Sequence, residues 1–586
     1  MLGRTFPWSA ALLAAVFFAG CTGGPPPAAP EPVAALPSPF VPADWPLFER
    51  AEPIEALSAM VSSVHPLASE IGAEILEKGG NAVDAAVAVG FALAVVHPAA
   101  GNIGGGGFMV IRFADGTVRT LDYRETAPGR ASRDMYLDET GELTDKSWIG
   151  HLAAGVPGSV AGLVAAQERF GEFTLAEVMA PAIRLARDGF TLDEYRSASL
   201  RYASERLARF PASRRQFLLP SGEAPSAGTL LLQSDLARTL KAVADSGRHA
   251  FYEGYVADLI VAEMERGGGL ISREDLASYE AIWREPISFD YRGYTIHSMA
   301  PASSGGVTMG EILNVYELLG SPPAYGSGEQ VHLLSETMRR AFADRNHFLG
   351  DPAFVEMPLD RLLSESYARE QVATIDRSHA TPTTALTPGL TDGDQTTHYS
   401  VVDQHGIAVS VTTTINGSYG NYVTVAGAGF LLNNEMDDFA AAPGQPNMYG
   451  LVQGEANAIE PGKRMLSSMT PSIVLDPDGR LFMILGTPGG STIITTVTQV
   501  ISNVIDHGMT LEEAISAPRV HHQALPDRIS FEPGGLLPEV VAHLETMGHT
   551  VEERSGYSGF VAGIMKTANG WVGVSDPRGD GGSVGF

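Results

Sequence analysis

A pair of threonines at residues 396 and 397 opens a stretch that is typical of a β-strand. Thr is β-branched and suits strands, but its hydroxyl can also act as a nucleophile when a base lies beside it. A cut between Gln395 and Thr396 creates that base, because it frees the α-amino group of Thr396. The preceding residues 376–395 are rich in Thr, Pro, Gly and Asp, which is typical of a flexible loop that can be cleaved.

A second candidate lies in the motif GTPGGST, where a turn leads into an expected helix. If Ser491 caps that helix, the N–H groups of Gly489 and Gly490 lie at its positive end without side chains in the way. Two such amides can stabilise the oxyanion of a tetrahedral intermediate. A helix start with a purely structural role fits the same motif.

These two motifs together describe an acyl-transfer site. It has a hydroxyl nucleophile on Thr396, an α-amine as base and two amides for the oxyanion. Thr414 ends the strand expected to pair with that of Thr396, where it can hydrogen-bond the Thr396 hydroxyl. Thr is common at strand ends, so the position alone does not establish this role.

The elements that must position these residues are strand hairpins with helices before and after them. Gly79-Gly80 separate two helices expected within residues 65–98, and Asn81 with Asp84 starts the second helix, which is apolar nearly all round and so should be buried. Residues 150–380 are mostly helical in pattern. The expected strands are 108–113, 118–123, 396–403, 407–414, 472–476, 481–486, 527–531 and a segment within 561–575, and later helices fit 487–508 and 537–547. This order favours a layered α/β architecture.

Four consecutive glycines, Gly104 to Gly107, invite comparison with a phosphate-binding loop. They precede a strand instead of following one, and no Lys closes the motif, so nucleotide binding is disfavoured. Close backbone packing before the strand pair is the preferred interpretation.

Composition limits the classes of partner. The chain has 586 residues, a hydrophobic fraction of 44% and a formal net charge of −29. A length of this kind suggests two to about four domains. The acidic charge repels polyphosphate, so the sequence argues against nucleic acid and favours a small molecule or peptide.

The N-terminus predicts export. Residues 1–20 carry Arg4 and an apolar stretch of signal-peptide length, and they precede Cys21, the only cysteine, which rules out a disulfide within one molecule. The arrangement resembles a bacterial lipobox, with Phe18 where the motif usually has Leu, and the alternative is a plain signal peptide. Residues 21–45 are Pro/Ala-rich, as in a tether. We therefore expect a bacterial protein of the periplasm or cell envelope, anchored to the membrane only through lipid on Cys21.

Several blocks together carry a family resemblance: NAVDAAVA, NIGGGGFM, DYRETAP, QTTHYSVVD, LLNNEMDDF, LSSMTPSIV, TPGGS, APRVHHQ and SDPR. From about residue 50 to the C-terminus, the chain resembles gamma-glutamyltransferase, also called gamma-glutamyl transpeptidase or glutathione hydrolase. The resemblance implies an N-terminal nucleophile hydrolase fold, an αββα sandwich. It also implies a precursor that cleaves itself between Gln395 and Thr396 into a large subunit, 46–395, and a small catalytic subunit, 396–586.

The resemblance also assigns roles to residues. Thr396 is the nucleophile, Thr414 activates it, and Gly489 with Gly490 forms the oxyanion hole. In the family, an Arg and two Ser hold the α-carboxylate of the γ-glutamyl group, and an amide with two acids binds its α-amino group. The corresponding residues are Arg124, Ser467 and Ser468 for the carboxylate, Asn416, Glu435 and Asp438 for the amine, and Tyr449 for the gating position of a lid over 441–450.

Residue chemistry agrees with this division, because a guanidinium fork with two hydroxyls suits a carboxylate, and acids with an amide suit an ammonium. The acids of LLNNEMDDF can also suggest Ca²⁺, but the regular ligand spacing of a calcium loop is missing. His521 and His522 are adjacent without partners at ligand spacing, so they are expected to be structural. We expect no metal and no cofactor.

The leading hypothesis is an enzyme that transfers the γ-glutamyl group of glutathione or related compounds to water, amino acids or dipeptides. The first rival is an acylase for glutaryl β-lactam side chains, or a depolymerase of poly-γ-glutamate. Glutaryl has no ammonium, so the acids at 435 and 438 argue against the acylase. The second rival is an uncleaved surface lipoprotein that uses the fold only for binding.

Overall fold

The first two long helices follow from local capping. α1 (Pro66–Glu77) and α2 (Ala82–Val96) are separated as predicted, and Asn81 and Asp84 form a capping box in which each side chain accepts from the other's backbone N–H. Every residue of α2 is buried, which confirms the expectation from its all-round apolar pattern.

The computed structural model describes residues 38–383 and 396–586, which lie in one compact unit, Pro37–Phe586. The predicted export signal, Cys21 and Gln395 lie outside the described residues. Within these ranges, no helix is both long enough and apolar enough to cross a membrane.

Two seven-stranded sheets form the centre of the unit, and all their strand pairs are antiparallel. The first sheet has the spatial order β19 (Gly582–Gly585), β2 (Met60–Ser63), β10 (Thr397–Val402), β11 (Ala408–Thr414), β3 (Gly106–Arg112), β4 (Val118–Asp122) and β7 (Ile282–Arg284). The second has the order β1 (Ile54–Ala56), β18 (Trp571–Ser575), β17 (Ala562–Lys566), β13 (Leu481–Leu485), β12 (Ser472–Leu475), β9 (Tyr294–Ser298) and β8 (Ile287–Tyr291). The predicted hairpins β3–β4, β10–β11 and β12–β13 are confirmed.

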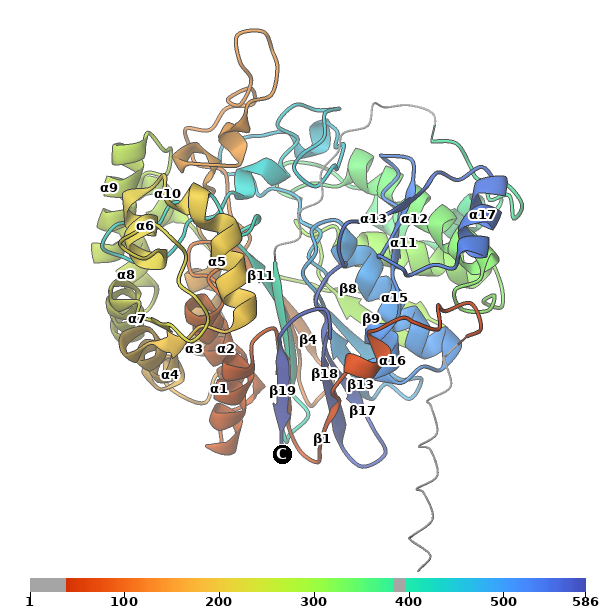
Figure 1. The fold of residues 1–586 in the computed structure, drawn as a ribbon, viewed down its shortest axis with the longest axis horizontal. Helices are drawn as coiled ribbons and strands as arrows, with labels where there is room; N and C mark the ends of the chain where they lie inside the picture. The colour runs from red at the N-terminus through yellow and green to blue at the C-terminus, as the bar shows by residue number, and fades with distance from the viewer. Residues whose placement is uncertain (1–37, 384–395) are drawn as a thin grey trace, which may run out of the picture. The chain divides into compact units, whose positions relative to one another are not determined.

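Helices cover the outer face of each sheet (Figure 1). On the side of the first sheet lie α1, α2, α3 (Ser159–Phe170), α4 (Leu175–Asp188), α5 (Glu194–Leu207), α6 (Pro211–Phe217), α7 (Ser234–Ser246), α8 (Arg248–Tyr252), α9 (Tyr255–Gly267) and α10 (Arg273–Ser278). On the other side lie α11 (Gly305–Leu318), α12 (Gly328–Phe348), α13 (Leu359–Leu362), α14 (Glu365–Val372), α15 (Thr492–His507), α16 (Leu511–Ser516) and α17 (Pro538–Thr546). The layers therefore run helix, sheet, sheet, helix, which confirms the predicted αββα sandwich.

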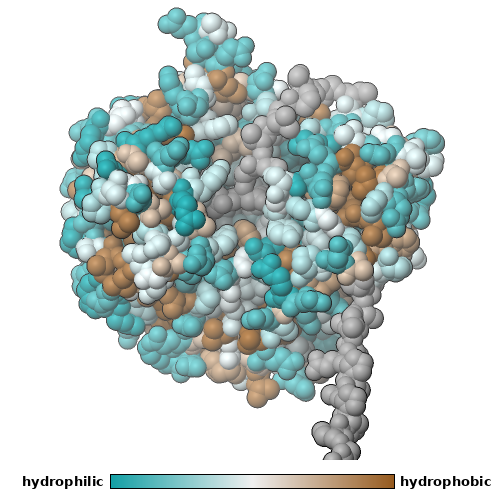
Figure 2. Space-filling model, in the orientation of Figure 1, coloured by the Kyte–Doolittle hydropathy of each residue, from teal (hydrophilic) through white to brown (hydrophobic). Residues whose placement is uncertain are grey.

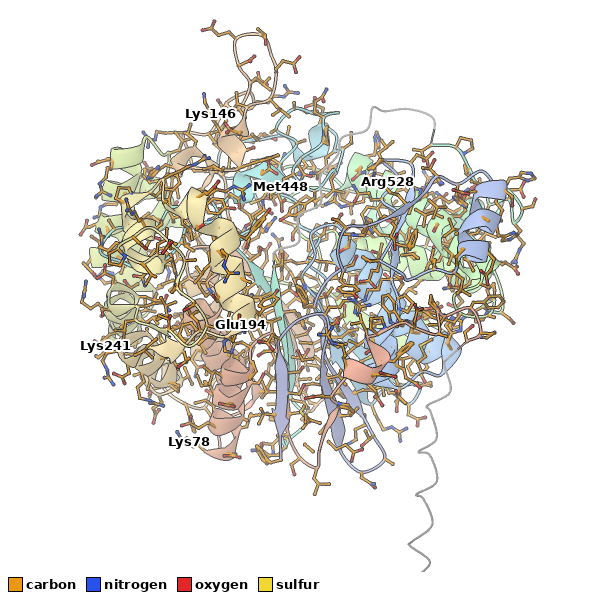
Figure 3. All side chains as sticks on the ribbon, viewed as in Figure 1. Lys78, Lys146, Glu194, Lys241, Met448 and Arg528 are labelled. Carbon is orange, nitrogen blue, oxygen red and sulfur yellow. The ribbon has the colours of Figure 1, made fainter. Side chains whose placement is uncertain are left out.

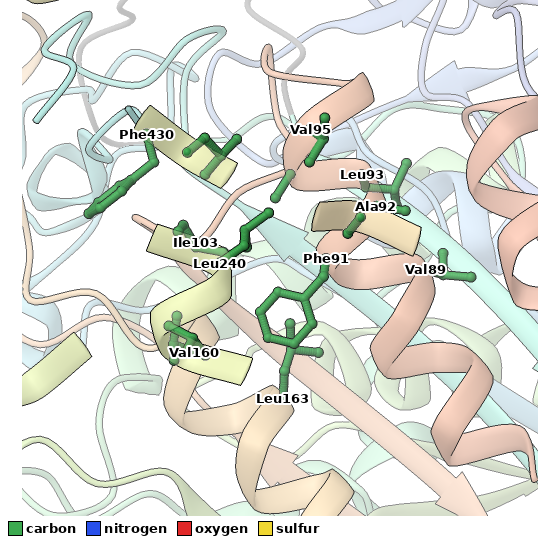
Figure 4. Packing of buried hydrophobic residues seen from close by; sticks show 14 of the residues in the cluster. Val89, Phe91, Ala92, Leu93, Val95, Ile103, Val160, Leu163, Leu240 and Phe430 are labelled. Carbon is green, nitrogen blue, oxygen red and sulfur yellow. The ribbon is translucent and has the colours of Figure 1, made fainter. Parts of the chain in front are cut away.

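Three apolar interfaces hold these layers together. The largest lies between the first sheet and its helices, where Phe91 of α2 packs among Val160 and Leu163 of α3 and Leu240 of α7 (Figure 4). A second apolar cluster lies between the second sheet and α11, α12 and α15. A smaller one fills the space between the sheets and includes Trp571. Burial of apolar surface on both faces of each sheet is what makes four layers stable.

The region 150–380 is mostly helical, as predicted, but it also contains strands that the sequence pattern did not single out. β5 (Phe190–Thr191) and β6 (Leu230–Leu231) form a small sheet of their own, whereas β7, β8 and β9 join the two central sheets, and the last two form the edge of the second sheet. β8 alternates buried and exposed residues, and the β8–β9 turn contains Gly293 at φ +86°. The alternation that predicts a strand was therefore present, but it extends over only the five residues of β8.

The predicted tether, 21–45, ends earlier than expected. Val41 and Trp45 are buried, and Trp45 Nε1 donates a hydrogen bond to Ser516 O over 2.8 Å. Residues 38–45 are thus part of the folded body, because the apolar side chains among the prolines find a site beside α16.

The glycine run has the packing role that we expected. A Cβ on Gly105 would lie 2.0 Å from Thr414 O, and one on Gly104 would lie 2.1 Å from Leu431 O. Asn102 braces the same contact, since its Nδ2 donates to Thr414 O over 2.9 Å. The glycines therefore let the chain entering β3 pass close to the end of β11.

The surface is consistent with the acidic composition. On the face drawn in Figure 2, hydrophobic residues are scattered among hydrophilic ones. Single exposed apolar side chains of this kind are ordinary for a folded protein in water.

We predict that Gly105→Ala displaces the end of β11, because its Cβ meets a backbone carbonyl that cannot move aside. The overpacking should cost about 1–3 kcal/mol of stability, read as a lower midpoint of urea unfolding. Gly556→Ala is the matched control, since a Cβ there has no neighbour within 4 Å. Equal midpoints for the two variants would contradict the packing role.

Candidate active site

The sheet pairing brings Thr396 and Thr414 together. Thr397 pairs with Thr413 in the β10–β11 ladder, so the residue before β10 meets the last residue of β11. The two hydroxyl oxygens lie 3.3 Å apart, with Thr396 as donor, and Thr396 is 7% exposed. Thr414 Oγ1 also accepts from Asn416 N over 2.8 Å. The Thr396 hydroxyl is therefore held in a buried position by the side chain that sequence reasoning selected.

His398 lies near Thr396 in sequence, but both of its ring nitrogens form hydrogen bonds with other residues. Its Nδ1 bonds Thr412 Oγ1 over 2.8 Å, and its Nε2 bonds Ser400 Oγ over 3.1 Å. Burial lowers the pKa of His398 to about 3, so it stays neutral. This ring is a structural part of the strand pair and leaves the base to another group.

The glycine pair precedes α15 as predicted, but Ser491 does not cap the helix with its side chain. Ser491 Oγ instead donates to Gln523 Oε1 over 2.6 Å, and Thr492 Oγ1 donates to Gly489 O over 2.7 Å. Gly489 and Gly490 have φ values of +138° and +55°, which favour glycine. Neither of their N–H groups donates to another described residue. Both amides are therefore available to a ligand.

Arg124 is the charged centre of the site. It follows β4, is fully buried, and forms ion pairs with Glu435 and Asp438 of the 3₁₀ helix Glu435–Asp438. A third acid, Glu125, has its Oε2 3.7 Å from Arg124 Nη1. The three predicted head-group residues thus meet directly, with the guanidinium bridging the two acids.

Burial destabilises the ionised forms of the acids in this cluster. It raises the pKa of Glu435 well above its ordinary value and also raises that of Asp438, although the positive charge of Arg124 acts in the opposite direction. Burial raises the pKa of Glu125 to about 7. These acids therefore ionise more readily when a positive group lies beside them, and the guanidinium groups of Arg124 and Arg345 both act in this way on Asp438.

A tyrosine closes the site from the segment 441–450. Tyr449 OH donates to Asn416 Oδ1 over 2.5 Å, and a Cβ on Gly490 would lie 2.5 Å from Tyr449 Cδ1. Asp437 Oδ2 holds the segment by accepting from Met448 N over 2.9 Å, and burial raises the pKa of Asp437 to about 6. Figure 3 labels Met448 above the sheets, between the two groups of helices.

Arg345 is a site residue that sequence reasoning missed. Its Nη2 donates to Ser468 Oγ over 3.2 Å and its Nε donates to Ser304 Oγ over 3.1 Å. It forms no ion pair with any described acid, and burial lowers its pKa to about 10, so it remains charged at neutral pH. The sequence did contain a signal that Arg345 is buried, because this residue falls on the same face of α12 as Met338 and Phe342, at helical spacing from them.

One cleft collects most of the predicted site. Its lining includes Thr396, Thr414, Asn416, Glu435, Asp438, Tyr449, Arg124, Ser467, Ser468 and Gly490, together with Arg345 and the apolar residues Leu451, Leu466, Met469 and Ile493. Gly489 lies next to this lining, and Gln395 is outside the described residues. The arrangement offers a hydroxyl, two amides, two guanidinium groups and two acids around one small space, which suits acyl transfer from a substrate with a charged head group.

Among the residues that the structure describes, the acids of the motif LLNNEMDDF are engaged with other protein groups. Glu435 and Asp438 pair with Arg124, and Asp437 accepts from Ser147 Oγ over 2.7 Å and from Met448 N over 2.9 Å. His521 likewise has a protein partner, since its Nδ1 forms a hydrogen bond with Thr495 Oγ1 over 2.8 Å.

Comparisons with known proteins point to one family. A family model described as gamma-glutamyltranspeptidase matches residues 68–586. The chain is 46% identical over 533 residues to the glutathione hydrolase proenzyme of Escherichia coli (strain K12), covering 90% of this chain and 91% of that protein. It is 40% identical over 549 residues to the Acylase ACY 1 proenzyme of Pseudomonas sp. (strain SE83), covering 90% and 94%. The solved cephalosporin acylase from Bacillus halodurans matches with a TM-score of 0.81 and 28% identity, covering 93% of this chain and 99% of that one.

We predict that Gly490→Ala loosens the segment 441–450, because its Cβ takes the place of the Tyr449 ring. Limited proteolysis should cut this segment faster than in the unchanged protein. Gly508→Ala, at the other end of α15, is the matched control, since Gly508 also has a positive φ of +64° but no neighbour within 4 Å of an added Cβ. Similar cutting in both variants would show that backbone strain, not the ring contact, is responsible.

Proposed function

The chain belongs to the gamma-glutamyltranspeptidase family, and we propose that Thr396 is the residue that carries the γ-glutamyl group during its reaction. As a member of this family, it is a gamma-glutamyltransferase or glutathione hydrolase made as a proenzyme. The proposed donor is glutathione or a related γ-glutamyl compound. The proposed acceptors are water, amino acids and dipeptides.

The proposed reaction has two halves. After cleavage at Gln395–Thr396, the α-amine of Thr396 takes the hydroxyl proton while the oxygen attacks the γ-carbonyl carbon. The amides of Gly489 and Gly490 stabilise the oxyanion, the C–N bond breaks, and the proton passes to the leaving amine. Water or an acceptor amine then attacks the ester, gives its proton to the α-amine, and restores the Thr396 hydroxyl.

The observation that carries the proposal is the ion-paired state of Arg124. Glu435 is buried with it and Asp438 is mostly buried, so a ligand that draws Arg124 away binds best when it also supplies a positive group to the acids, which would otherwise have to take up protons. The α-carboxylate and α-ammonium of a γ-glutamyl group do both at once. We propose that the carboxylate binds Arg124, Ser467 and Ser468, with Arg345 supporting Ser468, and that the ammonium binds Asn416, Glu435 and Asp438.

The same argument weighs against the acylase alternative, although relatives named as acylases are 40% identical. A glutaryl group brings a carboxylate but no ammonium, so it would leave the buried acids unpaired. Breaking a buried ion pair by removing one partner costs about 3–5 kcal/mol, or roughly a hundredfold or more in the rate of reaction with the free enzyme. The pocket therefore selects an amino acid head group.

The position of the segment 441–450 supports a role for it in the choice between water and an amine as acceptor. Tyr449 bonds Asn416 and covers Gly490, so the segment 441–450 shields the ester from water as long as it stays closed. We propose that an amine acceptor enters when this segment opens. We also propose, from the predicted export signal and Cys21, that the enzyme works in the cell envelope.

We predict that Thr396→Ala remains a single chain, because it lacks the hydroxyl that attacks the Gln395–Thr396 peptide bond. Thr397→Val is the matched control, since the Thr397 hydroxyl is buried without a hydrogen-bond partner among the described residues and Val has the same shape. A denaturing gel should show two subunits for the control and one band for Thr396→Ala. Normal cleavage of Thr396→Ala would contradict the nucleophile assignment, and a single band for the unchanged protein would favour the non-enzymatic lipoprotein.

A further inference from the structure

A second polar cluster lies outside the active-site cleft, nearer the start of α12 than Arg345, which lines that cleft. It consists of His332 and Glu336, one turn apart on α12, and His549, which follows α17. All three residues are buried, and their potential ligand atoms lie within 4.8 Å of one another. Two come from before Thr396 in sequence and one from after it. The cluster therefore joins the two parts of the chain that cleavage separates.

The tautomer of His332 is fixed by its surroundings. Its Nε2 lies 2.8 Å from the backbone oxygen of Asp376, which can only accept, so Nε2 carries the proton. Nδ1 then presents a lone pair toward His549 Nε2, 2.7 Å away. A histidine whose second nitrogen donates to a backbone carbonyl is oriented in the way that metal-binding histidines usually are.

Glu336 is held in place by several hydrogen-bond donors. Its Oε1 accepts from Arg339 Nε over 3.2 Å and from Thr381 N over 3.1 Å, and its Oε2 accepts from Arg340 Nη1 over 2.7 Å. The Thr381 side chain also acts on this carboxylate, so the metal ion would share Glu336 with its present hydrogen-bond donors. Arg339 is itself ion-paired with Asp527, which offsets its charge near the cluster.

We propose that His332, Glu336 and His549 form a binding site for a divalent metal ion, with Zn²⁺ as the best match. Two imidazole nitrogens and one carboxylate oxygen are a zinc ligand set, with a water molecule as the fourth ligand. Zn–N and Zn–O distances near 2.0–2.2 Å require ligand atoms about 3.3 Å apart in a tetrahedron. The His332–His549 pair must open by about half an ångström and Glu336 must move inward, both of which are rotamer adjustments.

The hydrogen bonds around the two rings suit this use of the histidines. His332 donates through Nε2 to Asp376 O, so its Nδ1 keeps the lone pair that faces His549. A neutral imidazole keeps a lone pair for a metal, whereas the charged form has none. Binding the ion moves the remaining proton of His549 from Nε2 to Nδ1 and releases none from His332.

The site has a structural consequence. Ala380 N donates to Met547 O over 2.8 Å, and Thr383 N donates to Asp527 Oδ2 over 2.7 Å, so residues 376–383 are docked on the same surface. This segment leads toward Gln395. A metal ion bound to its neighbours would connect both halves of the chain after cleavage and hold this segment between them.

The test is direct metal binding to the purified full chain after removal of metal with a chelator. We expect one Co²⁺ or Zn²⁺ per protein, with the visible absorption of four-coordinate Co²⁺ and a higher unfolding temperature in Zn²⁺. His549→Gln should lose the absorption and the temperature shift, weakening the affinity by more than the roughly 10–100-fold that loss of an outer partner costs. His379→Gln is the matched control, since His379 is exposed in the same segment.

Two outcomes would overturn the proposal. No binding by the unchanged protein would overturn the proposal whether or not the variants fold, and so would equal binding by His549→Gln and His379→Gln. Self-cleavage into two subunits and turnover of a γ-glutamyl substrate report that each variant is folded, because none of these residues lies in the active-site cleft.

Discussion

The pairing of Arg124 with Glu435 and Asp438 is the interaction on which the active site depends. These charges are buried, and buried charges are stable only when they are matched. The pairing ties the end of β4 to the 3₁₀ helix that follows the β11 region, and so it shapes the cleft beside Thr396. We propose that a substrate replaces these partners charge for charge. Stability and selectivity thus arise from the same contacts.

The four layers supply the second requirement, which is a fixed nucleophile. The β10–β11 ladder sets Thr396 beside Thr414, and the glycines before β3 let the neighbouring strand approach the end of β11. α15 brings Gly489 and Gly490 to the same point from the other sheet. Because these groups lie on strands and helix ends that are buried on both sides, their geometry is preorganised before substrate arrives.

Much of this could be predicted from the sequence, because periodicity and turn residues are local signals. The α2 capping box and the strand hairpins have such signals, and family motifs marked most of the cleft. Arg345 was missed because it lies in a helix of ordinary composition, and only the folded chain shows that it meets Ser468. Ser491 is the N-cap residue of α15, but its hydroxyl donates to Gln523, which is distant in sequence, instead of to the helix. The edge strand β8 was overlooked because five residues give a weak alternation.

The most direct measurement is the turnover of γ-glutamyl-p-nitroanilide beside glutaryl-p-nitroanilide by the purified mature enzyme. The two substrates differ only in the ammonium that we assign to Asn416, Glu435 and Asp438. We predict that kcat/KM is higher for the γ-glutamyl compound by about a hundredfold or more, from a cost of at least ~3 kcal/mol for leaving the acids unpaired. Equal values, or a preference for glutaryl, would contradict it.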